Sequence, residues 1–217
     1  MVNDFLKKHR KGTMFGNIVF ERYLEDTEYV HSALASEELE KLEAVQEYFK
    51  TYARQYDFDW LMLLALAYQE SRLEPRARSA SGAVGIMQIK PSTARDKNVN
   101  IADVTKVENN IHAGVKYLRF IRDRYFDDPG MDQLDRALFT FAAYNAGPGR
   151  ISRLRKEASR QGLDPNIWFD NVEKVAAQRV GREPVDYVGN ILKYWVAYKL
   201  ALENSTITPQ AWELASL

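Results

Sequence analysis

Glu70 closes the longest apolar run of the chain, and its position suits a proton donor. The run covers Trp60 to Tyr68, and a loop rich in Ser and Gly separates it from the polar Gln88. A carboxyl group at the end of a buried helix has a raised pKa, because burial and the negative end of the helix dipole both disfavour its charged form. An acid that stays protonated near neutral pH can donate to the leaving oxygen as a glycosidic bond breaks. Position alone nevertheless favours a surface glutamate that faces water or pairs with a nearby arginine.

The composition excludes several other kinds of site. The three histidines (His9, His31 and His112) are scattered and cysteine is absent, so local spacing assembles neither a metal centre nor a disulfide framework. We therefore expect no metal and no cofactor. The 30 basic and 30 acidic side chains give a formal net charge of zero, which argues against a general nucleic-acid binder. The longest apolar run is about half of the roughly 20 residues that a membrane-spanning helix needs, so no span is expected in this chain.

Helices are the elements that must position Glu70. Apolar residues recur at the helical period through most of the chain, and Asp59 offers an N-cap for the helix that ends near Glu70. Pro75 limits that helix, because the residue before a proline is pushed out of the helical region. A short hairpin is expected at residues 83–89, within a loop at 78–91. The other helices are expected at residues 37–55, 107–125, 132–146, 149–161, 165–180 with Pro165 in the first turn, and 184–203 with Pro184 likewise.

This pattern predicts one main domain with an appendage. A chain of 217 residues is long enough to bury one sizeable core. Residues 1–35 mix charges, aromatics and Gly without sustained periodicity, and we interpret them as an N-terminal appendage. Residues 36–217 are expected to form a mainly α domain with a small β-hairpin or loop element beside its active-site cleft. The basic N-terminus has no apolar segment behind it and does not resemble an export signal, so the chain is either cytoplasmic or a piece of a longer protein.

Several separated motifs occur in an order typical of one enzyme family. They are the pair ES at residues 70–71, Ser79, SGAVG, GIMQI, AYNAGPGR and EPVDYV. Together they resemble the goose-type-lysozyme-like lytic transglycosylases (SLT family), which cleave bacterial cell-wall peptidoglycan. The resemblance covers about residues 37–203 and implies a lysozyme-like helical fold. Residues 3–30 also resemble the end of the solute-binding module found upstream in the membrane-bound lytic transglycosylase F branch.

The reaction implied by this resemblance is a non-hydrolytic cleavage of the β-1,4 bond between N-acetylmuramic acid (MurNAc) and N-acetylglucosamine (GlcNAc). Glu70 would act first as the acid and then as the base. The C6 hydroxyl of MurNAc attacks its own C1, which gives a 1,6-anhydro sugar. One protein carboxylate suffices, because the substrate supplies the nucleophile. No second catalytic carboxylate stands out, and Glu74, next to Pro75, is expected at the surface.

The resemblance also implies substrate contacts around Glu70. Ser79 matches a serine thought to contact the MurNAc N-acetyl group, the Gln88 amide can donate to and accept from sugar hydroxyls, and the Tyr187 hydroxyl is expected to point at Glu70. For the others an ordinary structural role competes: helix capping for Ser71, a helix C-terminus for Tyr144 and Asn145, and core packing, the stronger interpretation, for Met87 and Tyr117. The implied substrate-binding residues are Ser71, Ser79, Met87, Gln88, Tyr117, Tyr144, Asn145 and Tyr187.

Two other functions stay open at this point. A hydrolytic goose-type lysozyme would need a positioned water and usually a second acid, for which Asp96, Asp103 and Asp186 are candidates. A peptidoglycan-binding domain without activity could keep the same motifs. The expected partner in each case is the glycan strand of peptidoglycan. The family branch implies a periplasmic, outer-membrane-associated location for a full-length protein with a possible regulatory module upstream. Lys90 stands where many family members carry methionine, and it could meet a peptide carboxylate.

Overall fold

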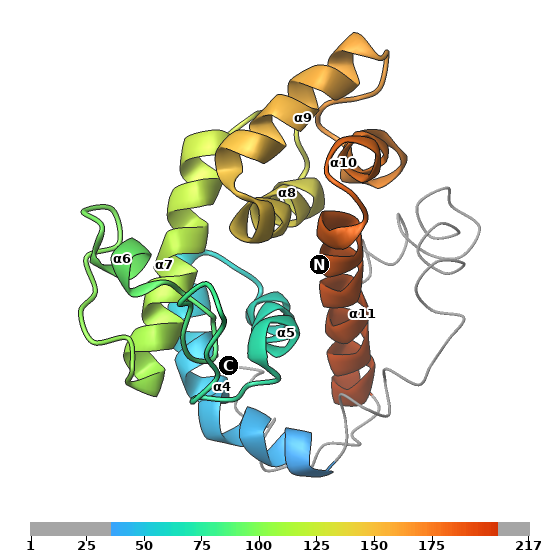
Figure 1. Ribbon diagram of the computed structural model, residues 1–217. Coiled ribbons are helices and arrows are strands. Elements are labelled where there is room, and N and C mark those ends of the chain that lie inside the picture. The colour runs from blue at the N-terminus through green and yellow to red at the C-terminus, as the bar shows by residue number, and fades with distance from the viewer. Residues whose placement is uncertain (1–35, 204–217) are drawn as a thin grey trace.

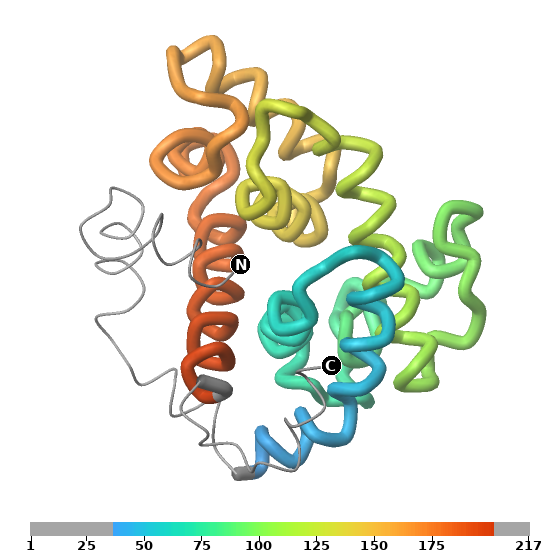
Figure 2. Tube along the Cα trace, turned by 180° about the vertical axis from the view of Figure 1, so that it is seen from behind, coloured from blue at the N-terminus to red at the C-terminus, as the bar shows by residue number. Residues whose placement is uncertain are grey.

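The central element of the fold is α5 (Trp60–Ser71), which carries Glu70 in its last turn. Its residues from Leu61 to Tyr68 are all buried, and it packs against α4 (Ser36–Tyr56) and α11 (Glu183–Glu203), as Figures 1 and 2 show from opposite sides. A helix that is apolar almost all round is stable only when other helices surround it. The computed structural model describes residues 36–203, so the predicted appendage at 1–35 lies outside the described residues.

Both ends of α5 follow from local chemistry. The Asp59 carboxylate accepts the backbone N–H groups of Leu61 (2.8 Å) and Met62 (3.3 Å), which confirms the predicted N-cap. The helix ends at Ser71 because Arg72 (φ 51°) and Leu73 (φ 58°) adopt left-handed backbone conformations. The helix therefore stops before the limit that Pro75 sets.

The other long helices agree with the sequence periodicity to within a residue or two. Helix α6, a single turn after the loop, was not predicted. Figure 1 shows α7 and α11 flanking the centre of the molecule, with α9 and α10 at one end. The remaining bounds are α6 Pro91–Arg95, α7 Val107–Tyr125, α8 Gln133–Ala146, α9 Pro148–Arg160, the short element η2 Trp168–Val172 and α10 Glu173–Arg179.

The single helix predicted at residues 165–180 is wrong. The backbone of Phe169 (ψ 137°) and Asp170 (φ 59°) is not helical, and regular helix begins only at α10. Side chains take the backbone donors here: Asp135 accepts the Trp168 N–H at 2.7 Å, and Glu173 accepts the Asp170 N–H at 2.8 Å. The break also lets two successive aromatic side chains, those of Trp168 and Phe169, both enter the core.

The predicted hairpin at residues 83–89 is not confirmed. Among the described residues this segment forms only isolated antiparallel bridges, from Val84 to Arg78 and to Ile89. Gly82 (φ 84°), Gly85 (φ 75°) and Gln88 (φ 44°) interrupt the extended conformation that two paired strands would need. The segment is a loop of successive turns, held mainly by side chains.

Two apolar clusters support these elements. The larger cluster joins α5 to its helical neighbours and includes the fully buried Phe49, Trp168 and Tyr198. The smaller cluster lies beneath the loop and includes Val84 and Val104. None of the described helices combines the length and the apolar character needed to cross a membrane.

Candidate active site

The Glu70 side chain contacts a residue of α11, the last described helix. The Tyr187 hydroxyl, from the first turns of α11, donates a hydrogen bond to Glu70 Oε1 across 117 positions of sequence. Burial raises the pKa of Glu70 to about 7, and the hydrogen bond from Tyr187 opposes that rise because it stabilises the carboxylate. Glu70 can therefore exchange a proton near neutral pH. The hydroxyl contact expected from the EPVDYV motif is present.

Tyr144 completes a small group of ionisable side chains around Glu70. Its hydroxyl donates to the Met87 carbonyl oxygen at 2.7 Å, so α8 is tied to the loop. Burial is the main cause that raises the pKa of Tyr144 and of Tyr187 well above the ordinary tyrosine value, and the negative charge of Glu70 is the second cause. Both hydroxyl groups therefore stay protonated and act as neutral donors.

Ser71 joins α5 to the loop. Its hydroxyl donates to the Ile86 carbonyl oxygen at 2.8 Å and lies 3.4 Å from the Ala67 carbonyl oxygen. The hydroxyl has one hydrogen, and the shorter contact uses it. Ser71 therefore positions the backbone beside Glu70, and its predicted contact with substrate would have to use the oxygen as an acceptor.

Ser79 and Gln88 make most of their bonds within the loop itself. The exposed Ser79 accepts the Ala83 N–H at 2.9 Å, so its hydroxyl stabilises the turn at residues 79–83. The Gln88 amide nitrogen donates to the carbonyl oxygens of Gly85 (2.8 Å) and Ala77 (3.2 Å). Both amide hydrogens are thus engaged, so the carboxamide oxygen is the part of Gln88 left to meet a sugar hydroxyl.

Met87 and Tyr117 serve the core. The Met87 side chain is fully buried and packs on Gly114, where an added Cβ would lie 2.7 Å from Met87 Cβ. The half-buried Tyr117 ring packs on the main cluster, with its centroid 5.7 Å from that of Tyr144. Both positions fit the packing interpretation that the sequence favoured for them.

Asn145 lies at the end of α8, where its amide nitrogen is 3.4 Å from Glu183 Oε1 at the start of α11. It thus links the two helices that carry Tyr144 and Tyr187. Lys90 is exposed and precedes the first residue of α6.

The other carboxylates considered from the sequence as a possible second catalytic acid lie on the surface and bond to nearby residues. Glu74 is exposed and accepts the Arg76 N–H at 3.1 Å, as expected. Asp96 accepts the Asn98 N–H at 2.9 Å, and Asp186 pairs with Arg182 at 3.2 Å. Asp103 is exposed and bonded to the Thr105 hydroxyl. None of these four has Glu70 as a hydrogen-bond partner. Within the described residues there is also no cluster of three or more His, Asp or Glu that could hold a metal ion.

Asn110 is the residue that sequence reasoning missed. Only 1% exposed, it donates to the carbonyl oxygens of Val84 and Val104, both at 2.9 Å, and accepts the Met87 N–H at 2.8 Å. Gly85 makes room for it, because an added Cβ would lie 2.4 Å from Asn110 Nδ2. The available signal was a polar residue on the apolar stripe of the helix at 107–125, where a buried amide needs partners.

The model of the transglycosylase SLT domain family matches residues 47–167, which is more than half of the chain. The chain belongs to this family. The matched region contains every predicted site residue except Tyr187, which lies on α11, after the matched region ends. The SLT domain thus supplies Glu70, the loop and α8.

Individual relatives agree with this assignment. The chain is similar to a membrane-bound lytic murein transglycosylase F of Pseudomonas fluorescens, with 30% identity over 89% of this chain and 42% of the relative. It therefore spans less than half the length of that curated relative. Among solved structures, the 70 kDa soluble lytic transglycosylase of Escherichia coli has a TM-score of 0.55 and 28% identity, over 71% of this chain and 24% of that one. An inactive mutant of the lytic transglycosylase Slt from Pseudomonas aeruginosa has a TM-score of 0.54 and 24% identity, over 85% of this chain and 29% of that one. The mainly α, lysozyme-like fold predicted from the sequence is confirmed, apart from the hairpin.

Proposed function

We propose that this chain is the catalytic part of a lytic transglycosylase that cleaves the MurNAc–GlcNAc β-1,4 bond of peptidoglycan and leaves 1,6-anhydroMurNAc ends. The observation that carries the proposal is Glu70, a partly buried carboxyl group with a pKa of about 7 that accepts a hydrogen bond from Tyr187. A group with that pKa can both give and take a proton near neutral pH. Family membership supplies the substrate class.

In the proposed reaction, Glu70 protonates the bridging oxygen as the bond to C1 of MurNAc breaks, and the GlcNAc hydroxyl leaves. The C6 hydroxyl of the same MurNAc then attacks C1, and the Glu70 carboxylate accepts the hydroxyl proton. Tyr187 stabilises that carboxylate between the two steps, and Ser79, Gln88 and Asn145 are proposed to hold the sugars. No water is consumed, so one protein carboxylate is enough.

Digestion of purified peptidoglycan followed by mass analysis of the fragments tests this reaction. Wild type should release anhydroMurNAc ends, and Glu70→Gln should lower the rate at least about 100-fold, the scale of general acid catalysis. Asp135→Asn is a matched control. Burial raises the pKa of Asp135 to about 7 as well, but this residue bonds to Trp168 in another part of the fold. Asp135→Asn should cleave as fast as wild type.

Each rival function predicts a different result. Reducing ends in place of anhydro ends would indicate a hydrolytic lysozyme. Binding without release of fragments would indicate a peptidoglycan-binding domain without activity. Equal rates for wild type and Glu70→Gln would show that the acid has been assigned to the wrong residue.

We also propose that residues 36–217 form the catalytic domain and that residues 1–35 end an upstream solute-binding module. The curated relative's greater length supports this division. A fragment of residues 36–217 should then unfold cooperatively and cleave peptidoglycan like the whole chain. A fragment that does not fold would place the boundary elsewhere. The relative is named membrane-bound, which supports a periplasmic, outer-membrane-associated location for a full-length protein, to be checked by cell fractionation.

A further inference from the structure

Helix α9 lies at one end of the molecule (Figure 1) and exposes a row of basic side chains. The side of the helix that faces the core carries its buried residues, Ile151, Leu154 and Ala158. On the opposite side, exposed cations recur at intervals of three and four residues, the spacing that places side chains on one face of a helix. We call these residues the basic face: Arg153, Lys156 and Arg160.

Most of the charge on the basic face is not neutralised. Within residues 36–203, neither Arg153 nor Lys156 forms an ion pair with a carboxylate. Glu157, the one acidic residue of α9, lies 3.6 Å from Arg160 and 2.8 Å from Arg179 of the neighbouring α10. One negative charge is thus shared between two positive ones, and the basic face keeps a positive charge overall.

The first half of α4 gives the other end of the molecule the opposite charge. Figures 1 and 2 show the start of α4 and the whole of α9 at opposite ends. Glu37, Glu40 and Glu43 are exposed there, and none of them pairs with a cation of the described part of the chain. Because the formal net charge is zero, the molecule separates its charges instead of carrying an excess. A negatively charged plane would attract the α9 end and repel the α4 end.

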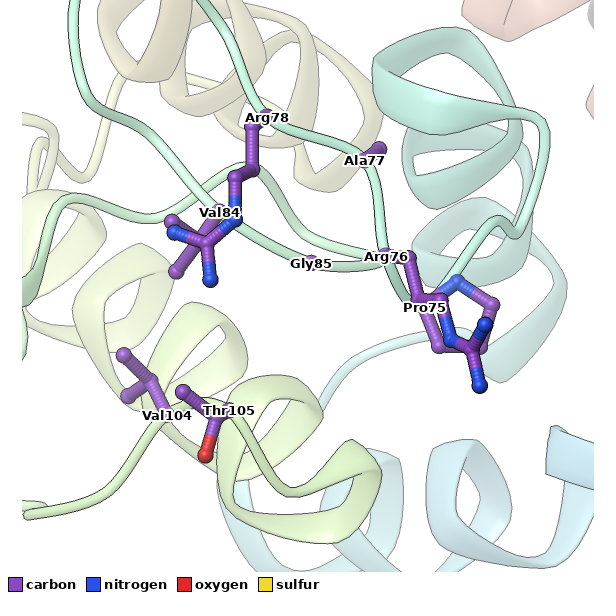
Figure 3. Close-up of a pocket in the computed structure, with 8 residues that line it drawn as sticks. All are labelled: Pro75, Arg76, Ala77, Arg78, Val84, Gly85, Val104 and Thr105. Atoms are coloured by element: carbon purple, nitrogen blue, oxygen red, sulfur yellow. The ribbon is translucent and has the colours of Figure 1, made fainter.

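The shape of the basic face suits a flat partner. Its cations lie on the outer side of a helix, whereas Arg76 and Arg78 line a pocket of about 300 Å³ between the loop after α5 and the segment before α7, as Figure 3 shows. A single polymer strand can be held in a concave pocket, but an open helix face matches an extended surface. Helix α9 also has no aromatic residue on which a nucleic-acid base could stack.

We propose that the basic face of α9 binds the surface of a bilayer that contains anionic phospholipids. The negative potential of such a surface attracts nearby Lys and Arg side chains, each of which strengthens binding about fivefold. The apolar side of α9 is buried in the core, so the helix does not insert among acyl chains and the contact is electrostatic. This contact holds the domain with α9 toward the lipid and the start of α4 away from it. No residue of α9 belongs to the proposed catalytic site, so the contact is independent of the proposed reaction.

Sedimentation of the whole chain with lipid vesicles tests this contact. Wild type should bind vesicles of phosphatidylglycerol and phosphatidylcholine but not vesicles of phosphatidylcholine alone, and added salt should release it. Arg153→Gln combined with Lys156→Gln should lower the partition coefficient about 5- to 25-fold. The same variant should keep the wild-type midpoint of urea unfolding, because both side chains are exposed and unpaired.

Arg95→Gln combined with Lys97→Gln is the matched control. It also removes one exposed arginine and one exposed lysine, but at the end of α6, away from α9. Its partition coefficient should stay within about twofold of the wild-type value, because charges more than about 10 Å from the lipid are screened at 0.1 M salt.

A third variant separates orientation from net charge. Glu40→Gln combined with Glu43→Gln removes two negative charges at the end of the molecule that would face away from the lipid. Its binding should also stay within about twofold of wild type. If binding rises in this variant and falls equally in the two cation variants, net charge alone drives binding and the proposal is overturned.

Two further results would also overturn it. If the α9 variant binds the vesicles as tightly as wild type, the lipid contact lies elsewhere, with the basic stretch KKHRK at residues 7–11 as the next candidate. If the α9 variant loses binding to purified peptidoglycan but not to the vesicles, the basic face serves the wall polymer and not a bilayer.

Discussion

Glu70 is subject to two opposing influences. Burial favours its protonated form, while the Tyr187 hydroxyl favours the carboxylate, and the pKa of about 7 reflects their balance. In the proposed reaction Glu70 first gives and then takes a proton, and both influences would help it. The protonated form would be available when the bond breaks, and the carboxylate would have a hydrogen-bond donor once the proton has left.

Tyr187→Phe should move the pH dependence of cleavage. The proposed reaction needs protonated Glu70, so kcat/KM of wild type should fall as pH rises through about 7. The lost hydrogen bond stabilised the carboxylate, so the pKa of Glu70 rises in the variant and the falling limb shifts upward, by about one pH unit. The maximal rate should decrease, because the carboxylate loses its donor. Initial rates measured across pH 5–9 give both quantities.

Tyr194→Phe is the control for this experiment. Tyr194 comes from the same helix and packs edge-on against Tyr68, with ring centroids 4.7 Å apart. The pH profile of kcat/KM for Tyr194→Phe should match that of wild type. A falling limb that stays in place in Tyr187→Phe would mean that a group other than Glu70 limits the reaction at high pH.

The sequence predicted the contact between Glu70 and Tyr187 but not the hydrogen bonds of their neighbours. Glu70 and Tyr187 were found from motifs, and their hydrogen bond is present. The bonding of Gln88 could not be foreseen, since its amide reaches two carbonyl oxygens of its own loop only because its backbone is left-handed (φ 44°). Asn110 was missed because two of its three partners, on Val84 and Met87, lie more than 20 positions away.

At the scale of elements, the loop beside Glu70 is fixed by three different helices. Ser71 at the end of α5 holds the Ile86 carbonyl oxygen, Asn110 of α7 holds the Met87 N–H, and Tyr144 of α8 holds the Met87 carbonyl oxygen. These bonds replace the ladder that a hairpin would have provided. The loop conformation therefore depends on all three helices being in place.

Two glycines of this loop provide a matched pair of substitutions. Both have positive φ, so alanine should cost about 1–2 kcal/mol of stability at either position. At Gly82 nothing lies within 4 Å of the added Cβ, and that strain should be the whole effect. At Gly85 the Cβ would lie 2.4 Å from Asn110 Nδ2, so Gly85→Ala should cost about 3–5 kcal/mol and lower kcat/KM at least about tenfold.

Urea unfolding and initial rates distinguish the two variants. Equal losses in Gly82→Ala and Gly85→Ala would show that backbone strain alone matters and that the contact with Asn110 does not.

Periodicity predicted the long helices because each buries one continuous stripe, as in α7. It failed at residues 165–180, where Asp135 of α8 accepts the Trp168 N–H and Glu173, within the segment, accepts the Asp170 N–H. The hairpin predicted at residues 83–89 did not form either, because positive φ values produced turns there. Each segment is also held by a side chain from a distant part of the sequence, Asp135 in the first and Tyr144 in the second.

At the scale of the whole molecule, two buried carboxyl groups should make stability depend on pH. Glu70 and Asp135 both have a folded-state pKa of about 7, above their usual values of 4.5 and 3.8. Between the usual pKa values and pH 7 the folded protein holds more protons than the unfolded chain. The free energy of unfolding should therefore decrease as pH rises toward 7 and then level off. The upper limit of this loss is about 3 kcal/mol for Glu70 and about 4 kcal/mol for Asp135.

Glu70→Gln and Asp135→Asn should therefore both be more stable than wild type at pH 8, by about 1–3 kcal/mol, with a difference that shrinks toward pH 5. Each amide keeps an oxygen for the existing donor, Tyr187 or the Trp168 N–H. Chemical denaturation at several pH values measures the effect. No gain at pH 8 in either variant would show that the carboxyl groups ionise in the folded protein at their ordinary pKa.

The hydrogen bond between Glu70 and Tyr187 joins residues 117 positions apart, one on the central helix and one on the last described helix. During synthesis the acid therefore emerges from the ribosome long before its donor, and the pair cannot form until α11 has docked on α5. A nascent or truncated chain that lacks α11 holds the acid without its partner. The proposed cleavage of peptidoglycan would therefore begin only after α11 has docked on α5.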